Sequence, residues 1–373
     1  MAWLLAVGGD AGIYLRRSTD GGKVWSIDQR VSNEGCSAYP PALAVNSGAI
    51  HVAWIDYGER IEGELYYSRS LDGGDTWEKN KILVDETNSA RYPLLMCKAD
   101  HVYMIWQDVE NKTYFKASHD RGLTWMETKL LANLDRHSCY CYPPTMCVNK
   151  DELSVAWTNV REDRGFHLLF KGLPLHSSRE NVVSTVVRRT SSDAGVTWGN
   201  EQILVKTKVS KEVKDEIDNP MMLSDGPLSH LFWLDKRNLR IGEIYYACVD
   251  FKKDRFPIDG KKLVLPEKRS PKRPAVAIDH EKRFHLTWTS FLGGTSIVNY
   301  CQSDLEGKVL IDKKGLTSDT GRFHNPVITV TSSGLLNVYW FDEPKDEWSR
   351  IFSKTSKDNG LTWEEWEHSK KDL

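Results

Sequence analysis

Four aspartates each stand two positions after a tryptophan that closes an apolar run: Asp56, Asp108, Asp235 and Asp342. A carboxylate at a strand end can act as a general acid or base, and two carboxylates at a suitable separation can cleave a glycosidic bond. These four residues are therefore the catalytic candidates. The alternative role for each is structural, because a strand-end Asp also accepts hydrogen bonds in turns and between neighbouring sheets.

A second group of polar residues stands mainly before prolines, where Tyr, Arg and Asn share the same slot. Such variation is expected where the fold does not dictate the residue. Arg side chains can grip an acidic ligand through paired hydrogen bonds, and aromatic side chains can line its pocket. The alternative for each Arg is a solvent-exposed surface residue with no ligand. The ligand-binding candidates are Tyr39, Arg91, Tyr92, Tyr142, Arg161, Arg237 and Arg273.

The elements that must position these residues follow from a repeated phrase, S-x-D-x-G-x-T-W. Its copies are STDGGKVW, SLDGGDTW, SHDRGLTW, SSDAGVTW and SKDNGLTW, with Asp20, Asp72, Asp120, Asp193 and Asp358. The intervals between these aspartates are 52, 48, 73 and 165 residues. Because the last interval is three times 55, two degenerate copies are expected within it, one at Asp304 and one near Asp250.

Two further phrases keep the same period. Apolar strands ending in Trp and a polar residue are centred on Trp54, Trp106, Trp157, Trp233, Trp288 and Trp340. A strand that begins with an X-Pro pair precedes each of them, and a Tyr-rich strand commonly follows. Alternating and β-branched runs cut by Gly and Pro are strand signals. Four strands in a period near 50 predict a β-propeller.

The sequence therefore predicts an all-β fold, a seven-bladed β-propeller of four-stranded antiparallel blades whose first blade lacks its innermost strand. A six-bladed propeller is the alternative. The propeller is expected to form one domain over residues 1–373, with blades at about 1–36, 37–89, 90–139, 140–214, 215–268, 269–321 and 322–373.

The repeated phrase is expected to reverse the chain between the third and fourth strands. Its Asp can accept hydrogen bonds from turn N–H groups, and its Gly permits a positive φ. Its Trp is expected to bury apolar surface between neighbouring sheets. Near-identical copies at blade spacing favour architecture over catalysis for these aspartates.

The phrase resembles that of the Asp-box, or BNR-repeat, propellers, of which the sialidases are the best-known enzymes, and the resemblance covers essentially the whole chain. It implies a sialidase-like site for a glycan. A sialidase would carry an R-I-P phrase, a cluster of three Arg that holds a carboxylate, an acidic general acid/base and a Tyr nucleophile activated by a Glu. The closest echoes of R-I-P here are R-Y-P at 91–93 and K-R-P at 272–274, in other blades.

Propeller topology would bring the X-Pro ends and the Trp-strand ends together at the mouth of a central channel, on the face away from the repeated turns. An insertion of about 25 residues between the second and third strands of the fourth blade contains Arg161 and would overhang this mouth. Long loops of this kind commonly shape a site. A solvated charged loop is the alternative.

Composition excludes several classes of protein. The net charge of −2 argues against nucleic-acid binding, and no apolar run is long enough to span a membrane. No phosphate-loop or metal-protease motif is present, so we expect no cofactor and no metal. The odd count of seven Cys and the absence of a signal-peptide pattern favour the cytoplasm, whereas the family resemblance would allow secretion.

Two functions remain open from the sequence. The first is a sialidase-like propeller that binds, and if enzymatic hydrolyses, an acidic or complex glycan as a glycoside hydrolase. The second is a non-enzymatic propeller that serves as a platform for protein interaction or assembly. The missing R-I-P strand and the extra blade support the second function.

Overall fold

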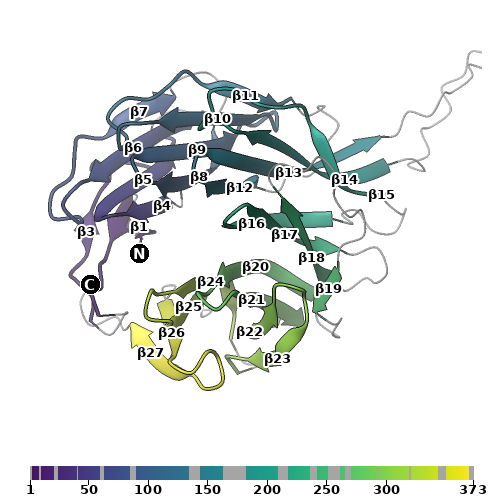
Figure 1. Ribbon diagram of the computed structural model, residues 1–373. Coiled ribbons are helices and arrows are strands. Elements are labelled where there is room, and N and C mark those ends of the chain that lie inside the picture. The colour runs from purple at the N-terminus through teal and green to yellow at the C-terminus, as the bar shows by residue number, and fades with distance from the viewer. Residues whose placement is uncertain are drawn as a thin grey trace, which may run out of the picture. The chain divides into compact units, whose positions relative to one another are not determined.

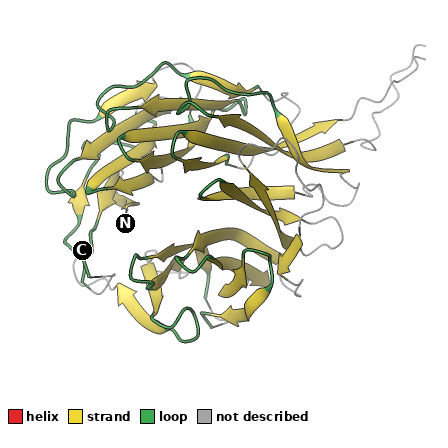
Figure 2. Ribbon diagram, in the orientation of Figure 1, coloured by secondary structure: helices red, strands yellow, loops and turns green. Residues whose placement is uncertain are grey.

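The computed structural model describes residues 2–7, 10–20, 24–39, 41–58, 63–84, 90–133, 143–162, 182–208, 217–235, 242–250, 261–264, 270–292, 294–318, 321–342 and 350–368. The chain divides into two compact units. Unit 1 comprises Met1–Asn159 and Val187–Ile203, and unit 2 comprises Val160–Val186 and Leu204–Leu373. Within the described ranges all regular structure is β-strand, as Figure 2 shows, and none of it is a helix that could cross a membrane.

Unit 1 begins with a three-stranded sheet and continues with four-stranded sheets, each in chain order (Figure 1). The three-stranded sheet is β1 (Ala2–Val7), β2 (Asp10–Leu15) and β3 (Gln29–Arg30). The next is β4 (Ala42–Asn46), β5 (Ala49–Asp56), β6 (Glu64–Ser70) and β7 (Lys81–Val84). It is followed by β8 (Arg91–Lys98), β9 (His101–Gln107), β10 (Thr113–Ser118) and β11 (Lys129–Ala132). The last is β12 (Thr145–Asn149), β13 (Glu152–Glu162), β14 (Val182–Ser191) and β15 (Gln202–Lys208), parts of which belong to unit 2.

Unit 2 contains three further four-stranded sheets. The first is β16 (Ile217–Asp225), β17 (Leu228–Asp235), β18 (Glu243–Asp250) and β19 (Lys261–Val264). The second is β20 (Ser270–Ile278), β21 (Arg283–Leu292), β22 (Thr295–Asp304) and β23 (Val309–Gly315). The third is β24 (Phe323–Val330), β25 (Leu336–Asp342), β26 (Arg350–Ser356) and β27 (Glu364–His368).

Small four-stranded antiparallel sheets in chain order define the class of protein as a β-propeller, which confirms the predicted fold class. The described residues form six complete four-stranded blades, the number given by the six-bladed alternative. The remaining sheet, β1–β3, has three strands and lies where the sequence predicts a blade without its innermost strand.

A Trp on the second strand anchors the core of each unit. In unit 1, Trp54 stacks on Tyr66 with ring centroids 5.8 Å apart, and Trp106 stacks on Tyr114 at 5.6 Å. In unit 2, Trp233 stacks on Tyr245 at 5.8 Å. These tryptophans are buried, and such aromatic pairs contribute roughly 0.5–1.5 kcal/mol beyond the area they bury.

The repeated phrase forms a turn, named here the SxDxGxTW turn, that is held by its own side chains. In the copy at Ser118–Trp125, Ser118 Oγ donates to Asp120 Oδ1 at 2.7 Å, while the amide and hydroxyl of Thr124 donate to the same carboxylate. Burial acts to raise the pKa of Asp120, but the hydrogen bonds from Thr124 and Ser118 outweigh it and hold that pKa at about 2. The same contacts recur at Asp72, Asp193 and Asp358, which supports the predicted structural role of these aspartates.

An aromatic side chain from one sheet fits against this turn in the next sheet. Tyr67 of β6 packs against Gly122, where an added Cβ would overlap the phenol ring, and Trp125 lies edge-on to the same ring at 5.0 Å. Phe115 contacts Gly195 in the same way within unit 1, and Tyr300 contacts Gly360 within unit 2. The turn tryptophans are half-buried and pack against the apolar core clusters, as Trp125 and Trp198 do in unit 1 and Trp363 does in unit 2.

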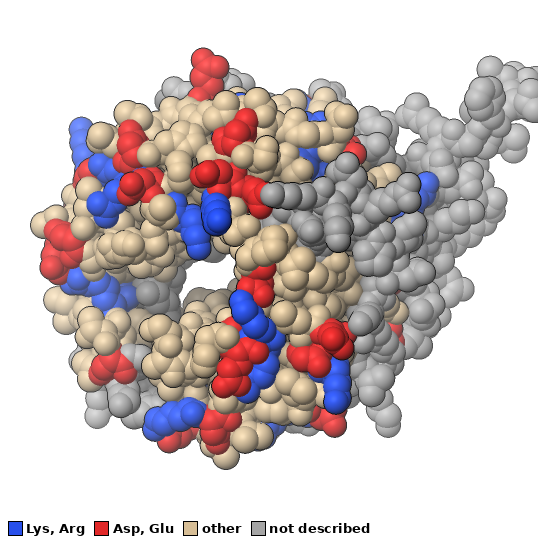
Figure 3. Space-filling view, viewed as in Figure 1, with Lys and Arg blue, Asp and Glu red and all other residues tan. Residues whose placement is uncertain are grey.

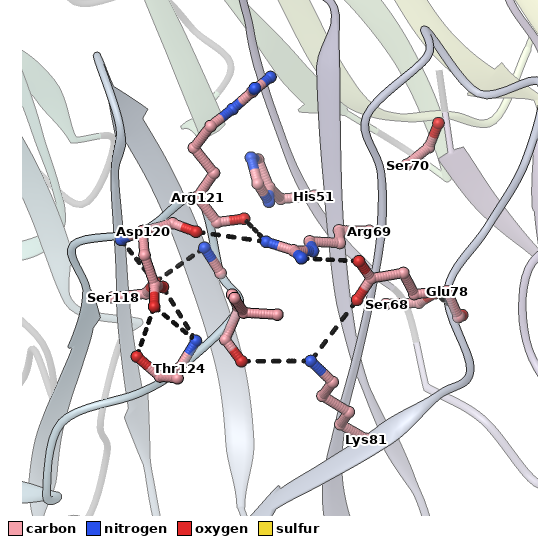
Figure 4. A network of polar contacts seen from close by, with 12 residues as sticks. His51, Ser68, Arg69, Ser70, Glu78, Lys81, Ser118, Asp120, Arg121 and Thr124 are labelled. Atoms are coloured by element: carbon pink, nitrogen blue, oxygen red, sulfur yellow. Dashed lines mark hydrogen bonds and ion pairs between the residues drawn. The ribbon is translucent and has the colours of Figure 1, made fainter.

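A buried arginine makes a second link between two sheets of unit 1 (Figure 4). Arg69 donates to the carbonyl oxygen of Arg121 at 2.5 Å and to that of Asp120 at 3.3 Å, both in the next SxDxGxTW turn. Its other terminal nitrogen pairs with Glu78 Oε1 at 2.6 Å. Lys81 donates to the carbonyl oxygen of Leu123 at 3.3 Å, so two cations of one sheet hold the turn of its neighbour.

Buried imidazole–phenol pairs complete the core. His51 Nδ1 lies 2.7 Å from the Tyr67 hydroxyl in unit 1, and His285 Nδ1 lies 2.8 Å from that of Tyr300 in unit 2. Burial, with a smaller contribution from Arg69, lowers the pKa of His51 to about 4. These histidines are therefore neutral near pH 7 and serve as hydrogen-bonded core residues.

Candidate functional site

The first strands carry a strained bulge at the X-Pro pair. Strands β8, β16, β20 and β24 each shift register there, and the residue before Pro has a positive φ in all four. These residues are Tyr92 (φ 52°), Asn219 (47°), Arg273 (48°) and Asn325 (50°). A left-handed conformation costs non-glycine residues roughly 1–3 kcal/mol and commonly marks a functional site, where a bulge re-aims side chains. The bulged ends are thus the candidate site, described separately for each unit.

In unit 2, two neighbouring bulges meet. Arg273 of β20 donates a hydrogen bond to the side-chain carbonyl of Asn325 in β24, and both residues are exposed. Beside them the ammonium group of Lys272 lies 5.0 Å from the ring centre of Phe291, a cation–π contact. The ring of His324 lies 5.5 Å from that of Phe291.

These five residues of unit 2 form what we call the basic cluster: Lys272, Arg273, Phe291, His324 and Asn325. The cluster presents two basic side chains and an amide that are exposed, beside a half-buried imidazole and a half-buried aromatic ring. Such a surface can bind a carboxylate or sulfate through charge-assisted hydrogen bonds and can contact the apolar face of a sugar ring.

Three carboxylates stand at the corresponding end of the sheet β16–β19. Asp235 pairs in register with Glu243 and with Ile217. Asp218 pairs with Leu234 instead, and its side chain therefore lies on the other face of the sheet. All three are buried. Asn219 donates to Asp218 at 2.9 Å, Trp233 donates to Asp235 at 3.4 Å, and Tyr245 donates to Glu243 at 3.3 Å. Glu243, a buried carboxylate in contact with a phenol hydroxyl, is a group capable of acid–base chemistry.

In unit 1 the candidate aspartates hold the backbone. Asp56 Oδ1 accepts N–H bonds from Ser37 and Gly58, both at 2.9 Å. Asp108 accepts N–H bonds from Glu110 and Lys112 and the Tyr114 hydroxyl at 3.0 Å. These contacts match the structural alternative that the sequence left open for strand-end aspartates, while the catalytic role stays a prediction.

Of the ligand-binding candidates of unit 1, Arg91 and Tyr92 lie at the bulge of β8, and Tyr39 precedes β4. Tyr39 and Tyr92 are more than half exposed, and Arg91 is exposed beside Tyr92. The ring of Tyr39 lies 5.1 Å from that of Tyr57, tilted by 60°. The described candidates of unit 1 are therefore two exposed tyrosines and one exposed Arg.

Several predicted residues have no described side-chain environment. Tyr142, Arg237 and insertion residues 163–181 lie outside the described residues, and for Arg161 only the backbone in β13 is described. Asp342 ends β25 in register with Phe323 and Arg350.

Sequence reasoning missed Phe291, which lies within an apolar strand run, and it missed the positive φ of the residue before proline in β8, β16, β20 and β24.

The surface itself is electrostatically mixed. Acidic and basic side chains are interspersed over the described surface in view in Figure 3, in keeping with the net charge of −2.

The described residues hold no group of three or more His, Cys, Asp or Glu side chains that could bind a metal ion. The five described cysteines, at 36, 97, 147, 248 and 301, are free thiols.

No protein-family model and no curated protein matches the sequence, but solved structures match the fold. A protein of unknown function from Dyadobacter fermentans is 12% identical, with 87% of this chain and 95% of that chain covered and a TM-score of 0.57. An ulvan lyase bound to a GlcA-containing saccharide is 12% identical, covering 87% and 82%, with a TM-score of 0.55. An α-L-arabinanase from Penicillium chrysogenum complexed with arabinobiose is 15% identical, covering 80% and 88%, with a TM-score of 0.53. At these identities the likeness is one of fold, that of a β-propeller.

Proposed function

We propose that this β-propeller binds an acidic glycan through the basic cluster of unit 2. The observation that carries the proposal is the exposed guanidinium of Arg273, which stands at the bulge of β20 and donates to Asn325 at the bulge of β24. Beside it, Lys272 and His324 flank Phe291. A uronate carboxylate or a sulfate ester matches these donors, and the pyranose ring matches the aromatic face.

The solved neighbours support a saccharide as the ligand. The ulvan lyase is bound to a GlcA-containing saccharide and the arabinanase to arabinobiose, and both share the fold. Resemblance of the repeated phrase to Asp-box propellers points in the same direction. The likeness in fold extends to no particular residue of the site.

Binding of polygalacturonate and of a sulfated polysaccharide, with neutral arabinan as the uncharged control, tests the proposal by calorimetric titration. Arg273→Ala should weaken binding of the acidic polymer by about tenfold or more, because a charge-assisted contact contributes roughly 1.5–3 kcal/mol. Lys308→Ala, an exposed cation on another loop, should leave binding unchanged. Equal affinity for acidic and neutral polymers, or an unchanged Arg273→Ala variant, would contradict the proposal.

Hydrolysis of the bound glycan is the further part of this proposal, with the carboxylates of the sheet β16–β19 as the reacting groups. Asp235 was a catalytic candidate, and Glu243 with Tyr245 forms a carboxylate–phenol pair. Release of reducing sugar that Asp235→Asn or Glu243→Gln abolishes, with binding retained, supports this role. Binding without any turnover by the wild-type chain leaves a lectin-like propeller.

A non-enzymatic interaction platform is the second candidate function. The observation that favours it is the use of Asp56 and Asp108 as backbone acceptors, which occupies these carboxylates structurally. A platform should recover a stoichiometric protein partner in affinity purification from its native source, and that partner should be insensitive to added acidic glycan.

A further inference from the structure

Two imidazoles face each other at one corner of the sheet β8–β11 in unit 1. His101 begins β9, and His119 directly follows the last residue of β10. Because Val102 pairs in register with Ser118, the two histidines stand across from each other at the end of the sheet that carries the SxDxGxTW turn. Their Nδ1 atoms lie 2.6 Å apart, and their ring planes are nearly perpendicular. At this distance one Nδ1 atom carries a proton and the other presents its lone pair.

The second nitrogen of each imidazole faces another side chain. His119 Nε2 lies 2.9 Å from the thioether sulfur of Met126, to which its N–H donates. The Nδ1 atom of neutral His119 is therefore the lone-pair partner, and the Nδ1–H group of His101 donates to it. His101 Nε2 lies 3.8 Å from Oδ1 of Asp151, which directly precedes β13.

This arrangement is that of two metal ligands with their supporting groups. A histidine that binds a metal commonly uses one ring nitrogen for the ion and directs the other at a carboxylate or similar acceptor, which fixes the tautomer and the orientation of the ring. Asp151 and Met126 stand in the supporting positions, and the two Nδ1 atoms converge on one point between the rings.

The SxDxGxTW turn itself does not require these side chains. In the sheet β24–β27, the positions of His119 and Met126 are occupied by Lys357 and Glu364, which form an ion pair at 2.8 Å. In the sheet β4–β7, the position of His119 is occupied by Leu71, which is 44% exposed. The fold therefore forms the same turn without an imidazole pair.

A small ion can reach the two rings and separate them. His119 is exposed, and the side chain of His101 is 27% exposed. Metal–imidazole bonds are about 2 Å long, so an ion held in line between two ring nitrogens needs them about 4 Å apart. The ring of His119 can swing outward about its side-chain bonds, because the backbone behind it is fixed by the hydrogen bond from Met126 N–H to the carbonyl oxygen of Ala117 at 2.8 Å.

We propose that His101 and His119 bind one monovalent copper ion, Cu⁺, between their Nδ1 atoms. Imidazole suits copper, and Cu⁺ accepts two ligands in a line, whereas Zn²⁺ takes four ligands and Ca²⁺ takes oxygen ligands. As the ion binds, the proton on Nδ1 of His101 moves to Nε2, where it faces Asp151, and the proton of His119 stays on Nε2 towards Met126. The neutral pair thus neither gains nor loses a proton. The two ligands come from different strands and lie outside the motifs from which the sequence predicts no metal.

Anaerobic titration of the full chain with Cu⁺, in competition with the chelator bicinchoninate, tests the proposal. Because thiols also bind Cu⁺, the accessible cysteines of every sample are first alkylated with N-ethylmaleimide. The wild type should bind one Cu⁺ per chain. X-ray absorption at the copper edge should show a two-coordinate ion with nitrogen ligands and no sulfur.

Four variants separate this site from other metal-binding groups. His101→Asn and His119→Asn should each abolish saturable binding, since a single imidazole remains. His119→Asn should still fold, because the side chain is exposed. Met126→Leu, which removes only a supporting group, should weaken binding about 10- to 100-fold. His280→Asn is the control, an exposed imidazole beside the carboxylate of Glu281 at 3.8 Å, and should bind Cu⁺ as the wild type does.

Three results would overturn the copper site. The first is a wild type that binds no Cu⁺, which leaves the imidazole pair as a hydrogen bond of the turn. The second is equal affinity in the wild type and His119→Asn, which places the ion elsewhere. The third is a copper shell that contains sulfur or more than two ligands, which assigns the ion to other donors.

Discussion

The phenol ring of Tyr67 occupies the place where a side chain at position 122 would begin. Gly122 has a φ of +83° and meets this ring, whereas Gly48 has a φ of +79° and nothing within 4 Å of its missing Cβ. The two glycines have the same backbone conformation in different surroundings. Substituting Gly48 therefore measures the cost of backbone strain alone, and substituting Gly122 measures that cost together with steric overlap.

Gly48→Ala should cost about 1–2 kcal/mol of unfolding free energy, the price of a left-handed Ala. Gly122→Ala should cost about 1–3 kcal/mol more than that, because the methyl group must displace Tyr67 from its packed position. Urea unfolding of both variants measures the difference. Equal losses would show that the ring yields freely and that Tyr67 does not hold the turn.

Arg69 should contribute more to stability than its neighbour Lys81. Arg69→Met leaves the carbonyl of Arg121 and the carboxylate of Glu78 without their buried cation, at a cost of roughly 2–3 kcal/mol. Lys81→Met removes an exposed cation at a cost below about 1 kcal/mol. Chemical denaturation of the two variants compares them, and a larger loss in Lys81→Met would refute this assignment.

Stability should fall in mild acid because of His51. The pKa of this buried imidazole is lowered from 6.5 to about 4, so the unfolded chain binds its proton at a higher pH than the folded chain does. Its stabilising contribution is complete above pH 6.5 and is lost as the pH falls towards 4, with a slope of at most about 1.4 kcal/mol per pH unit.

His51→Asn, which keeps a polar group near the Tyr67 hydroxyl, should reduce the slope of the stability profile between pH 6.5 and pH 4. The buried His230 and His285, whose pKa values burial also lowers, keep the rest of the slope. His280→Asn is the matched control, since that side chain is 64% exposed. Unfolding midpoints at pH 7, 6 and 5 give the slopes. Parallel profiles for the wild type and His51→Asn would rule out this histidine as the source.

The bulge at Tyr92 should store strain that Asn relieves. Asn tolerates the left-handed conformation better than Tyr does, and Asn already occupies the equivalent positions 219 and 325. Tyr92→Asn should therefore raise the unfolding free energy by about 0.5–1 kcal/mol, because the lost ring is half exposed. Tyr92→Phe, which keeps the strain, should not differ from the wild type in thermal unfolding. A destabilised Tyr92→Asn variant would mean that the Tyr ring makes a favourable contact.

The sheets could be predicted from the sequence because their strands repeat with a fixed period and each ends in a recognisable turn. The bulges could not, since the residue before a proline is ordinarily biased towards extended conformations, and the tertiary structure overrides that bias at Arg273 and Asn325. Arg273 could be chosen as a ligand-binding candidate because of its charge. Phe291 could not, because it lies in an apolar strand and the sequence does not show which of its side chains the neighbouring sheet covers. The turn roles of Asp56 and Asp108 were foreseen as alternatives, and their hydrogen bonds agree with them.

The fit of Tyr67 against Gly122 has an evolutionary consequence. The sheet β8–β11 and its turn contain both Phe115, the aromatic residue that enters the following turn, and Gly122, the glycine that receives Tyr67 of the preceding sheet. Tyr300 and Gly360 make the same contact in unit 2. A gene segment encoding one such repeat, when copied in tandem, yields neighbours that are complementary from the start. Lengthening of the chain by duplication then requires no new pair of compatible mutations at the junction.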